Sequence, residues 1–221
     1  MKQKTVSLIG ATGLIGGYLF EFFQKDSEYT KIKVLVRRPV QFSNPKVEVS
    51  VIDFSDTEAF KSEISGSDTV FCAIGTTNQK MKGNKEAYRK IDYDIPVNAA
   101  KFGLASGCSK FLFVSSIGAK SNSKNFYLKL KGETENALFD LNIPALYIFR
   151  PSLLIGKRQE FRIAELFGKL LMQPVSFLLP KKMKPIKAYD VAKSMYKASK
   201  SDAKGRHIYH YSEMKQLINN T

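Results

Sequence analysis

Several kinds of residue are scarce in this chain of 221 amino acids, and each scarcity excludes a class of protein. There are only two cysteines, Cys72 and Cys108, each beside a strand-like run. This usage fits buried thiols in a reducing compartment and not a disulfide framework, so we expect a cytoplasmic location. The two histidines, His207 and His210, lie three apart in a strand-like stretch. They would point to opposite faces, so no metal site is predicted.

Long apolar runs are also missing. No stretch reaches the roughly 18 uninterrupted apolar residues of a membrane span, and the richest, 167–180, is broken by Lys169, Gln173 and Pro174. We therefore expect no membrane span.

The apolar stretch 166–179 fits a homodimer interface as well as a core helix. The N-terminus has the basic start and apolar run of a signal peptide, but its glycine spacing gives a better account of it.

Acidic residues are in the minority. The chain has 35 Lys and Arg against 20 Asp and Glu, a formal charge of +15, which raises the question of nucleic acid or an anionic membrane. The basic residues are spread along the chain, and the densest cluster is 180–187. Zinc-finger spacings are absent and the aromatic residues are not grouped. A solvated surface is the favoured interpretation, with no specific nucleic acid as partner; binding through 180–187 is the weaker alternative.

Strand-like and helix-like segments alternate along the first two thirds of the chain. The strands are apolar on both faces, as in a buried parallel sheet, so the pattern predicts an α/β, doubly wound Rossmann fold. Predicted strands cover 5–10, 31–37, 46–53, 68–75, 110–116 and 145–151, and predicted helices cover 14–25, 55–64 (capped by Ser55), 85–106 (interrupted by Pro96) and 123–141.

The alternation weakens after Pro151. Helices are predicted near 159–172 and 188–200, the second with Asp190 as its N-cap, and a late strand at 206–211. The tail is too short, and too interleaved with the rest of the pattern, for a separate domain. We therefore predict one domain over 1–221, with 151–221 contributing a small lobe on the substrate side.

A glycine-rich turn joins the first predicted strand to the first helix. Gly10, Gly13 and Gly16 have the spacing G-x-x-G-x-x-G. Glycine permits a tight turn and close approach of a diphosphate to the free N–H groups of a helix N-terminus. The required context of strand, turn and helix is met, so nucleotide binding is predicted, with Thr12, Leu14 and Ile15 from the same turn.

The end of the second predicted strand reports on the type of nucleotide. A carboxylate there would bind the ribose 2′-hydroxyl of NAD, but this chain has Arg37 and Arg38. Guanidinium groups suit a 2′-phosphate, so NADP is predicted in preference to NAD. Further cofactor contacts are predicted after the third strand, at Asp53 and Phe54, and after the fourth, at Gly75, Thr76 and Thr77.

Three motifs in order, "GATGLIG", "FLFVSSIGA" and "YLKLK", resemble the short-chain dehydrogenase/reductase superfamily. The wider pattern, including "AIGTT" and "FRPSLLIG", is most similar to the atypical subgroup typified by the HIV Tat-interacting protein. The resemblance covers nearly the whole chain. It implies an oxidoreductase that uses NADP and acts on a small-molecule carbonyl or alcohol.

The resemblance also implies roles for particular residues. Tyr127 would give or take a proton at the substrate oxygen, Lys131 would hold the nicotinamide ribose and favour tyrosinate, and Ser116 (or Ser115) would bind the substrate oxygen. Residues four apart on a helix share one face, and a nearby ammonium makes a tyrosine, which ionises near pH ~10, useful at neutral pH. The segment with Pro151, Leu153 and Leu154 would pass near the nicotinamide.

Two departures limit what the resemblance carries. Asp92 stands where many extended members of the superfamily have asparagine, so the proton relay described for those members is not carried over to this position. The region after Pro151 is short, which disfavours a large nucleotide-sugar substrate. The rival hypothesis is a non-catalytic NADPH-binding regulatory or scaffold protein. Relatives of that kind have typically lost the Tyr–Lys pair, so its presence here favours the enzyme.

Overall fold

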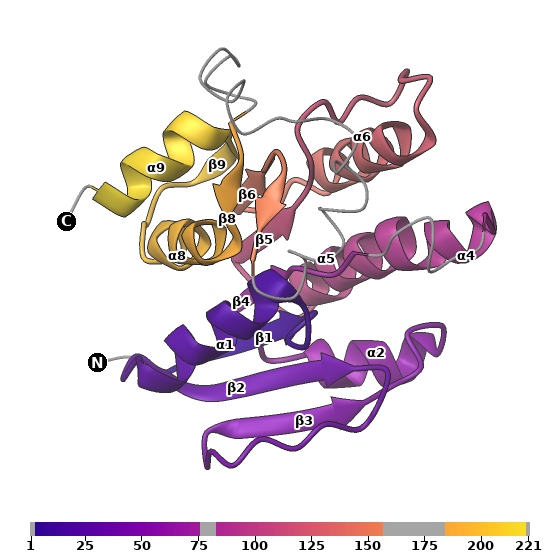
Figure 1. The fold of residues 1–221 in the computed structure, drawn as a ribbon. Helices are drawn as coiled ribbons and strands as arrows, with labels where there is room; N and C mark the ends of the chain where they lie inside the picture. The colour runs from indigo at the N-terminus through magenta and orange to yellow at the C-terminus, as the bar shows by residue number, and fades with distance from the viewer. Residues whose placement is uncertain (1–2, 76–82, 157–183, 220–221) are drawn as a thin grey trace.

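The computed structural model describes residues 3–75, 83–156 and 184–219 (Figure 1). The predicted helix at 159–172, most of the cluster at 180–187, and Thr76 and Thr77 lie outside the described residues.

The centre of the fold is one sheet of seven strands, all parallel, with the order β3-β2-β1-β4-β5-β6-β9 (Figure 1). The order reverses beside β1, which makes the carboxyl edge between β1 and β4 the place where such sheets bind ligands. The strands are β1 (Lys4–Ile9), β2 (Tyr29–Val36), β3 (Val47–Val51), β4 (Thr69–Cys72), β5 (Lys110–Val114), β6 (Ala145–Phe149) and β9 (Gly205–Tyr209). Two short strands, β7 (Leu154–Ile155) and β8 (Ile186–Lys187), pair separately.

Helices cover both faces of the sheet, which confirms the doubly wound α/β fold (Figure 1). One layer holds α1 (Leu14–Lys25), α8 (Ala188–Ser199) and α9 (Tyr211–Asn219). The other holds α2 (Thr57–Ile64), α5 (Ile95–Ala105) and α6 (Phe126–Asp140), with α4 (Lys85–Arg89) and the π-helical turn η1 (Lys90–Asp94) leading into α5.

The strands are apolar throughout because both of their faces are buried. Along β5, Phe111 and Phe113 pack under the α2–α5–α6 layer, whereas Leu112 and Val114 pack under the α1–α8 layer. Alternation of side chains across a strand therefore divides the same strand between two hydrophobic cores.

Two predicted helix caps are wrong. The N-cap of α2 is Asp56, one residue later than predicted, and its carboxylate accepts the N–H of Ala59 at 3.0 Å. Ser55 lies in the turn before the helix, where its backbone N–H donates to Asp53. The N-cap of α8 is the backbone of Lys187; Asp190 lies in the first turn, where it pairs with Lys215 of α9 at 2.9 Å.

Pro96 marks a change of helix type and not a break. It occupies the first turn of α5, where a missing N–H costs no hydrogen bond within that helix, and the preceding residues form the wider π-helical turn. The chain thus runs as one continuous helical segment from Lys85 to Ala105.

Part of the stretch after Pro151 belongs to the main sheet. The strand β9 pairs with β6 in register from Ala145 with Gly205 to Phe149 with Tyr209, and α8 packs against α1. Whether residues 151–221 also serve the substrate side stays a prediction.

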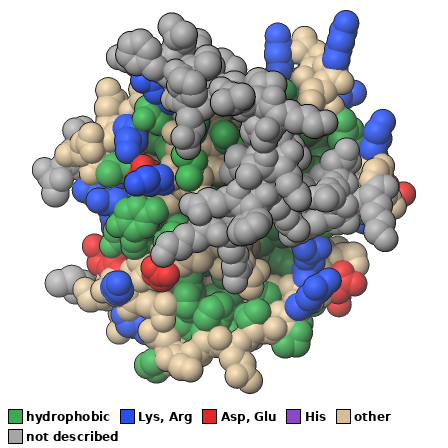
Figure 2. All heavy atoms as spheres, viewed as in Figure 1, with side chains coloured by type: hydrophobic (Ala, Val, Ile, Leu, Met, Phe, Trp, Pro, Cys, Tyr) green, Lys and Arg blue, Asp and Glu red, His purple; other side chains and the backbone are tan. Residues whose placement is uncertain are grey.

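Among the residues that the structure describes, no helix is long and apolar enough to cross a membrane. Lys and Arg side chains on the face shown in Figure 2 lie in several separate groups with hydrophobic and neutral side chains between them.

Candidate cofactor and active site

The glycine-rich turn follows β1 and can be built only with glycine at two of its positions. Gly10 has a φ of +96°, and a Cβ there would stand 2.7 Å from the backbone of Ala73. A Cβ at Gly16 would stand 2.0 Å from the Gly10 carbonyl oxygen. The glycines therefore bring the turn, the helix α1 and the end of β4 into backbone contact at the carboxyl edge of the sheet.

The N-terminus of α1 points its free N–H groups at this edge. Gly13 is the N-cap and provides no side chain to satisfy them, and it is exposed together with Thr12. Leu14 is half-buried at the first position of the helix, whereas the side chain of Ile15 is buried in the core. An anion would find backbone donors and the positive end of the helix dipole here.

The predicted nucleotide-selecting residues lie at the ends of neighbouring strands. Arg37 and Arg38 directly follow β2 and are exposed. After β3, the exposed carboxylate of Asp53 accepts the backbone N–H of Ser55 at 2.9 Å, which holds the pKa of Asp53 below its usual value. The ring of Phe54 packs edge-on against Phe60 at 4.8 Å, which fixes the turn.

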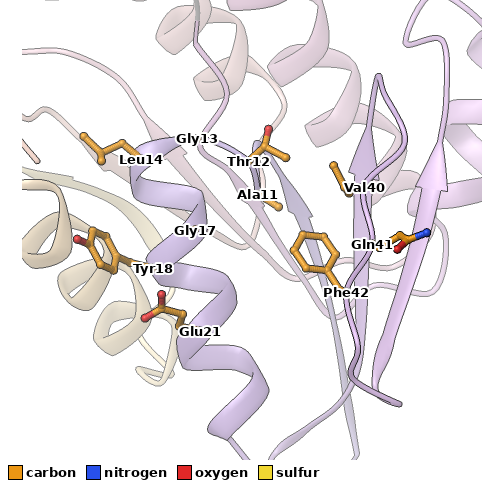
Figure 3. Close-up of a pocket in the computed structure, with 10 residues that line it drawn as sticks. All are labelled: Ala11, Thr12, Gly13, Leu14, Gly17, Tyr18, Glu21, Val40, Gln41 and Phe42. Atoms are coloured by element: carbon orange, nitrogen blue, oxygen red, sulfur yellow. The ribbon is translucent and has the colours of Figure 1, made fainter. Parts of the chain in front are cut away.

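A pocket of about 490 Å³ opens between the start of α1 and the segment after Arg38 (Figure 3). Thr12, Gly13 and Leu14, which the sequence predicted as cofactor residues, line it. No sequence pattern indicated the other residues of its lining. The full lining is Ala11, Thr12, Gly13, Leu14, Gly17, Tyr18, Glu21, Val40, Gln41 and Phe42.

The helix α6 carries Tyr127 and Lys131 on one face. Asn125 caps the helix by accepting the N–H of Leu128 at 3.1 Å, so Tyr127 lies in the first turn and Lys131 in the next. Tyr127 is half-buried, and its ring lies edge-on to Tyr88 of α4, with centroids 6.4 Å apart.

Lys131 lies one turn after Tyr127 on α6, and its side chain is buried. Its Nζ lies 3.0 Å from Oδ1 of Asp92 and donates to the Val114 carbonyl oxygen at 3.3 Å. Burial on its own lowers the pKa of Lys131, but the Asp92 carboxylate raises it above the ordinary value for lysine. The side chain is therefore a charged ammonium at neutral pH.

The two serines after β5 differ in their surroundings. Ser115 is buried and its hydroxyl donates to Oε1 of Glu135, which in turn accepts from Arg150. Ser116 is half-buried, and within the described part of the chain its hydroxyl donates to the neighbouring Ile117 carbonyl, at 3.3 Å. Ser116 is thus the serine whose hydroxyl can turn to another partner at little cost.

The loop after β5 is attached to α6. The Lys120 N–H donates to the Leu128 carbonyl at 3.0 Å, and the Ile117 N–H donates to the Pro151 carbonyl at 2.9 Å. These bonds bring the ends of β5 and β6 and the first turn of α6 together. Leu153 and Leu154 follow as half-buried residues, and the Leu153 carbonyl accepts from Ile186.

Gly75 is exposed at the end of β4 and stands close to the Tyr–Lys site. A Cβ added to it would lie 3.7 Å from Asp92 Oδ1. The predicted cofactor loop after β4 and the buried pair of Asp92 and Lys131 are therefore neighbours.

Four residues of this region were missed as partners by the sequence reasoning: Tyr88, Asp92, Glu135 and Arg150. Glu135 lies one turn after Lys131 on α6, and a buried carboxylate needs a partner, which is a usable signal. Which cation pairs with it depends on the packing of β6, and the sequence alone does not give that.

Known proteins that are similar to this chain indicate its family. A family described as NAD(P)H-binding matches residues 10–142. "Protein FMP52, mitochondrial" of Candida albicans is 33% identical over 195 residues, which cover 84% of this chain and 83% of that protein. "Protein HTATIP2" of Rattus norvegicus is 32% identical over 168 residues, covering 75% and 69%.

Solved structures agree on the fold. The structure of MoeE5 in complex with UDP-glucuronic acid and NAD superimposes with a TM-score of 0.72 at 13% sequence identity, covering 92% of this chain and 75% of that one.

The expected cytoplasmic location is contradicted by these comparisons, because the Candida albicans relative is named a mitochondrial protein. The expectation rested on Cys72 and Cys108, which are indeed free and buried. Buried thiols report only that disulfides do not form, and more than one compartment is reducing, so they could not identify the cytoplasm.

Proposed function

Because the chain belongs to the NAD(P)H-binding family and is an atypical short-chain dehydrogenase/reductase of the HTATIP2 kind, we propose that it is an NADP-dependent oxidoreductase. It transfers a hydride between the nicotinamide and a small carbonyl or alcohol substrate, with Tyr127 as the general acid or base. The observation that carries the proposal is the placement of Tyr127 and the buried Lys131 on one face of α6, beside the loop that bears Ser116.

The residues present fit a dinucleotide. Gly10 and Gly16 form a cradle that any Cβ would fill, and the uncapped N-terminus of α1 offers N–H groups to a diphosphate. Gly13, Thr12 and Leu14 would line the diphosphate end, and Arg37 and Arg38 would hold a 2′-phosphate by paired hydrogen bonds.

The remaining cofactor contacts follow the carboxyl edge of the sheet. The turn of Asp53 and Phe54 would border the adenine, and Gly75 would border the middle of the cofactor. Lys131 would hold the ribose next to the nicotinamide, and the segment of Pro151, Leu153 and Leu154 would enclose the nicotinamide itself. When bound, the cofactor supplies or accepts the hydride.

The chain's own residues handle the proton. The Tyr127 hydroxyl gives a proton to the substrate oxygen during reduction, or takes one during oxidation. Ser116 donates a hydrogen bond to that oxygen and orients it. Ser115 would have a structural role in the site, because its hydroxyl already donates a hydrogen bond to Glu135.

The rival proposal is an NADPH-binding protein without catalysis. The experiment that separates the two is a panel of aliphatic and aromatic aldehydes, ketones, quinones and alcohols, mixed with NADPH or NADP and followed by nicotinamide absorbance. Turnover that disappears in the Tyr127→Phe protein supports the enzyme. NADPH binding with no turnover on any member of the panel supports the rival.

A further inference from the structure

The ammonium of Lys131 is not alone in its site, because a carboxylate is in direct contact with it. The two atoms, Lys131 Nζ and Asp92 Oδ1, are 3.0 Å apart, and the side chains are only 3% and 1% exposed. Asp92 lies in the π-helical turn η1, and its carbonyl accepts from Thr134 of α6 at 3.1 Å. The turn and the helix thus hold the two charges together away from water.

This contact changes the electrostatic field at Tyr127. At an effective dielectric constant of about 20, a lone charge about 7 Å away acts on an ionisable group with about 2 kcal/mol, more than one pH unit. A carboxylate in contact with the ammonium opposes that field. The pair therefore favours tyrosinate less than an uncompensated lysine would.

Resting on the proposed function, we propose that Asp92 is a positioning residue that compensates the charge of Lys131, makes Tyr127 harder to ionise and so favours carbonyl reduction. In that direction the substrate carbonyl carbon receives the hydride from NADPH, and its oxygen receives the proton of the Tyr127 hydroxyl. The products are the alcohol and NADP, and the tyrosinate regains a proton from water. Oxidation would need tyrosinate before the reaction starts.

Among the residues that the structure describes, three further titratable groups lie near this pair, and the carboxylate of one of them, Glu135, is already paired with Arg150. Burial raises the pKa of the Cys72 thiol, on β4, to about 12. Burial also raises the pKa of Tyr88, on α4, with the negative charge of Asp92 adding to the effect. Of these groups, Asp92 is the one whose negative charge is in contact with the Lys131 ammonium.

Lys131 can stay charged without Asp92. The Val114 carbonyl still accepts from its Nζ, and the ammonium lies 4.8 Å from the centroid of the Phe113 ring, an attractive cation–π arrangement. Asp92→Asn keeps the size of the side chain and the backbone bond to Thr134, and removes the charge.

The test measures Tyr127 ionisation directly and needs no substrate. Tyrosinate absorbance is titrated against pH for each protein and for its Tyr127→Phe partner, and the difference between the two is the signal of Tyr127. Asp92→Asn is expected to move the midpoint to lower pH by roughly one unit. Asp94→Asn, the same change on a half-buried carboxylate of the same turn, is the matched control and should leave the midpoint within a few tenths of a unit.

The double variant Asp92→Asn/Lys131→Met removes both charges and is expected to titrate near the wild type; it also serves if the single variant does not fold. Superimposed titrations of wild type and Asp92→Asn up to the limit of stability, or a midpoint moved to higher pH, would overturn the proposal. So would a double variant that differs from the wild type by a full unit. Failure of the function shows separately, as absent turnover, because this titration does not depend on catalysis.

Discussion

Gly132 lies so close to Lys120 that a Cβ at position 132 would stand 2.3 Å from the Lys120 carbonyl carbon. Gly132 directly follows Lys131 on α6, and Lys120 belongs to the loop that begins with Ser115 and Ser116. The missing side chain therefore lets the serine loop rest on the helix that carries Tyr127 and Lys131. The spacing between serine and tyrosine depends on this contact.

We expect Gly132→Ala to lower the free energy of unfolding by about 1–3 kcal/mol, because backbone atoms must move to admit the methyl group. Gly17→Ala is the matched control, since its Cβ would be 3.8 Å from the nearest atom of another segment. It lies inside α1, where alanine is expected to be neutral or stabilising by up to about 1 kcal/mol. Urea unfolding of both variants checks this, and equal effects would show that the loop does not need the glycine.

Arg37 and Arg38 are expected to select NADPH over NADH by at least about tenfold, a difference of about 1.4 kcal/mol. Changing both to alanine should erase most of that preference while leaving NADH binding nearly unchanged. Arg206→Ala, on the opposite edge strand β9, removes a similar charge far from β2 and should retain the preference. Calorimetric titration is the measurement, and equal affinities of the wild type for the two cofactors would refute the assignment.

A polar cluster around Asp26, just before the start of β2, is expected to make the free energy of unfolding depend on pH. Burial on its own raises the pKa of Asp26, but hydrogen bonds from Lys200, the Glu28 N–H and Tyr196 hold it below its usual value. Because the folded-state pKa is the lower one, the stabilisation is present above about pH 4 and is lost as the pH falls through the folded-state value.

Asp26→Asn is therefore expected to cost about 1–3 kcal/mol at pH 7 and progressively less in strong acid. Glu48→Gln, which removes an exposed carboxylate paired with Lys31, should cost less than about 1 kcal/mol. Denaturant unfolding at several pH values makes the comparison. A cost for Asp26→Asn that stays constant down to pH ~2 would contradict the linkage.

The sequence was most informative where a pattern is local and repeated. The helix predicted over 14–25 was found with those bounds, and Gly10 and Gly16 lie in the strand-turn-helix arrangement that their spacing indicated. A glycine-rich turn and an apolar strand are determined by neighbours in the chain, so their structure can be read from short stretches.

Features that depend on packing between distant segments were not predictable in the same way. The pairing of Asp92 with Lys131 joins residues 39 positions apart, and only the fold brings η1 against α6. The choice between Ser115 and Ser116 likewise depends on Glu135 and Arg150, which lie on α6 and after β6. The cap of α2 was missed for a smaller reason, since Ser55 and Asp56 are both good caps and local geometry chose Asp56.

The central claim is that Tyr127 performs the proton transfer and is not needed to bind the cofactor. The most direct test measures NADPH binding by fluorescence titration and turnover on the best substrate of the panel, for the wild type and Tyr127→Phe. We predict NADPH affinity within about threefold of the wild type and turnover lower by roughly 10²-fold or more. Tyr127→Phe turning over at the wild-type rate would contradict the claim and leave Tyr127 as an ordinary residue of a helix face.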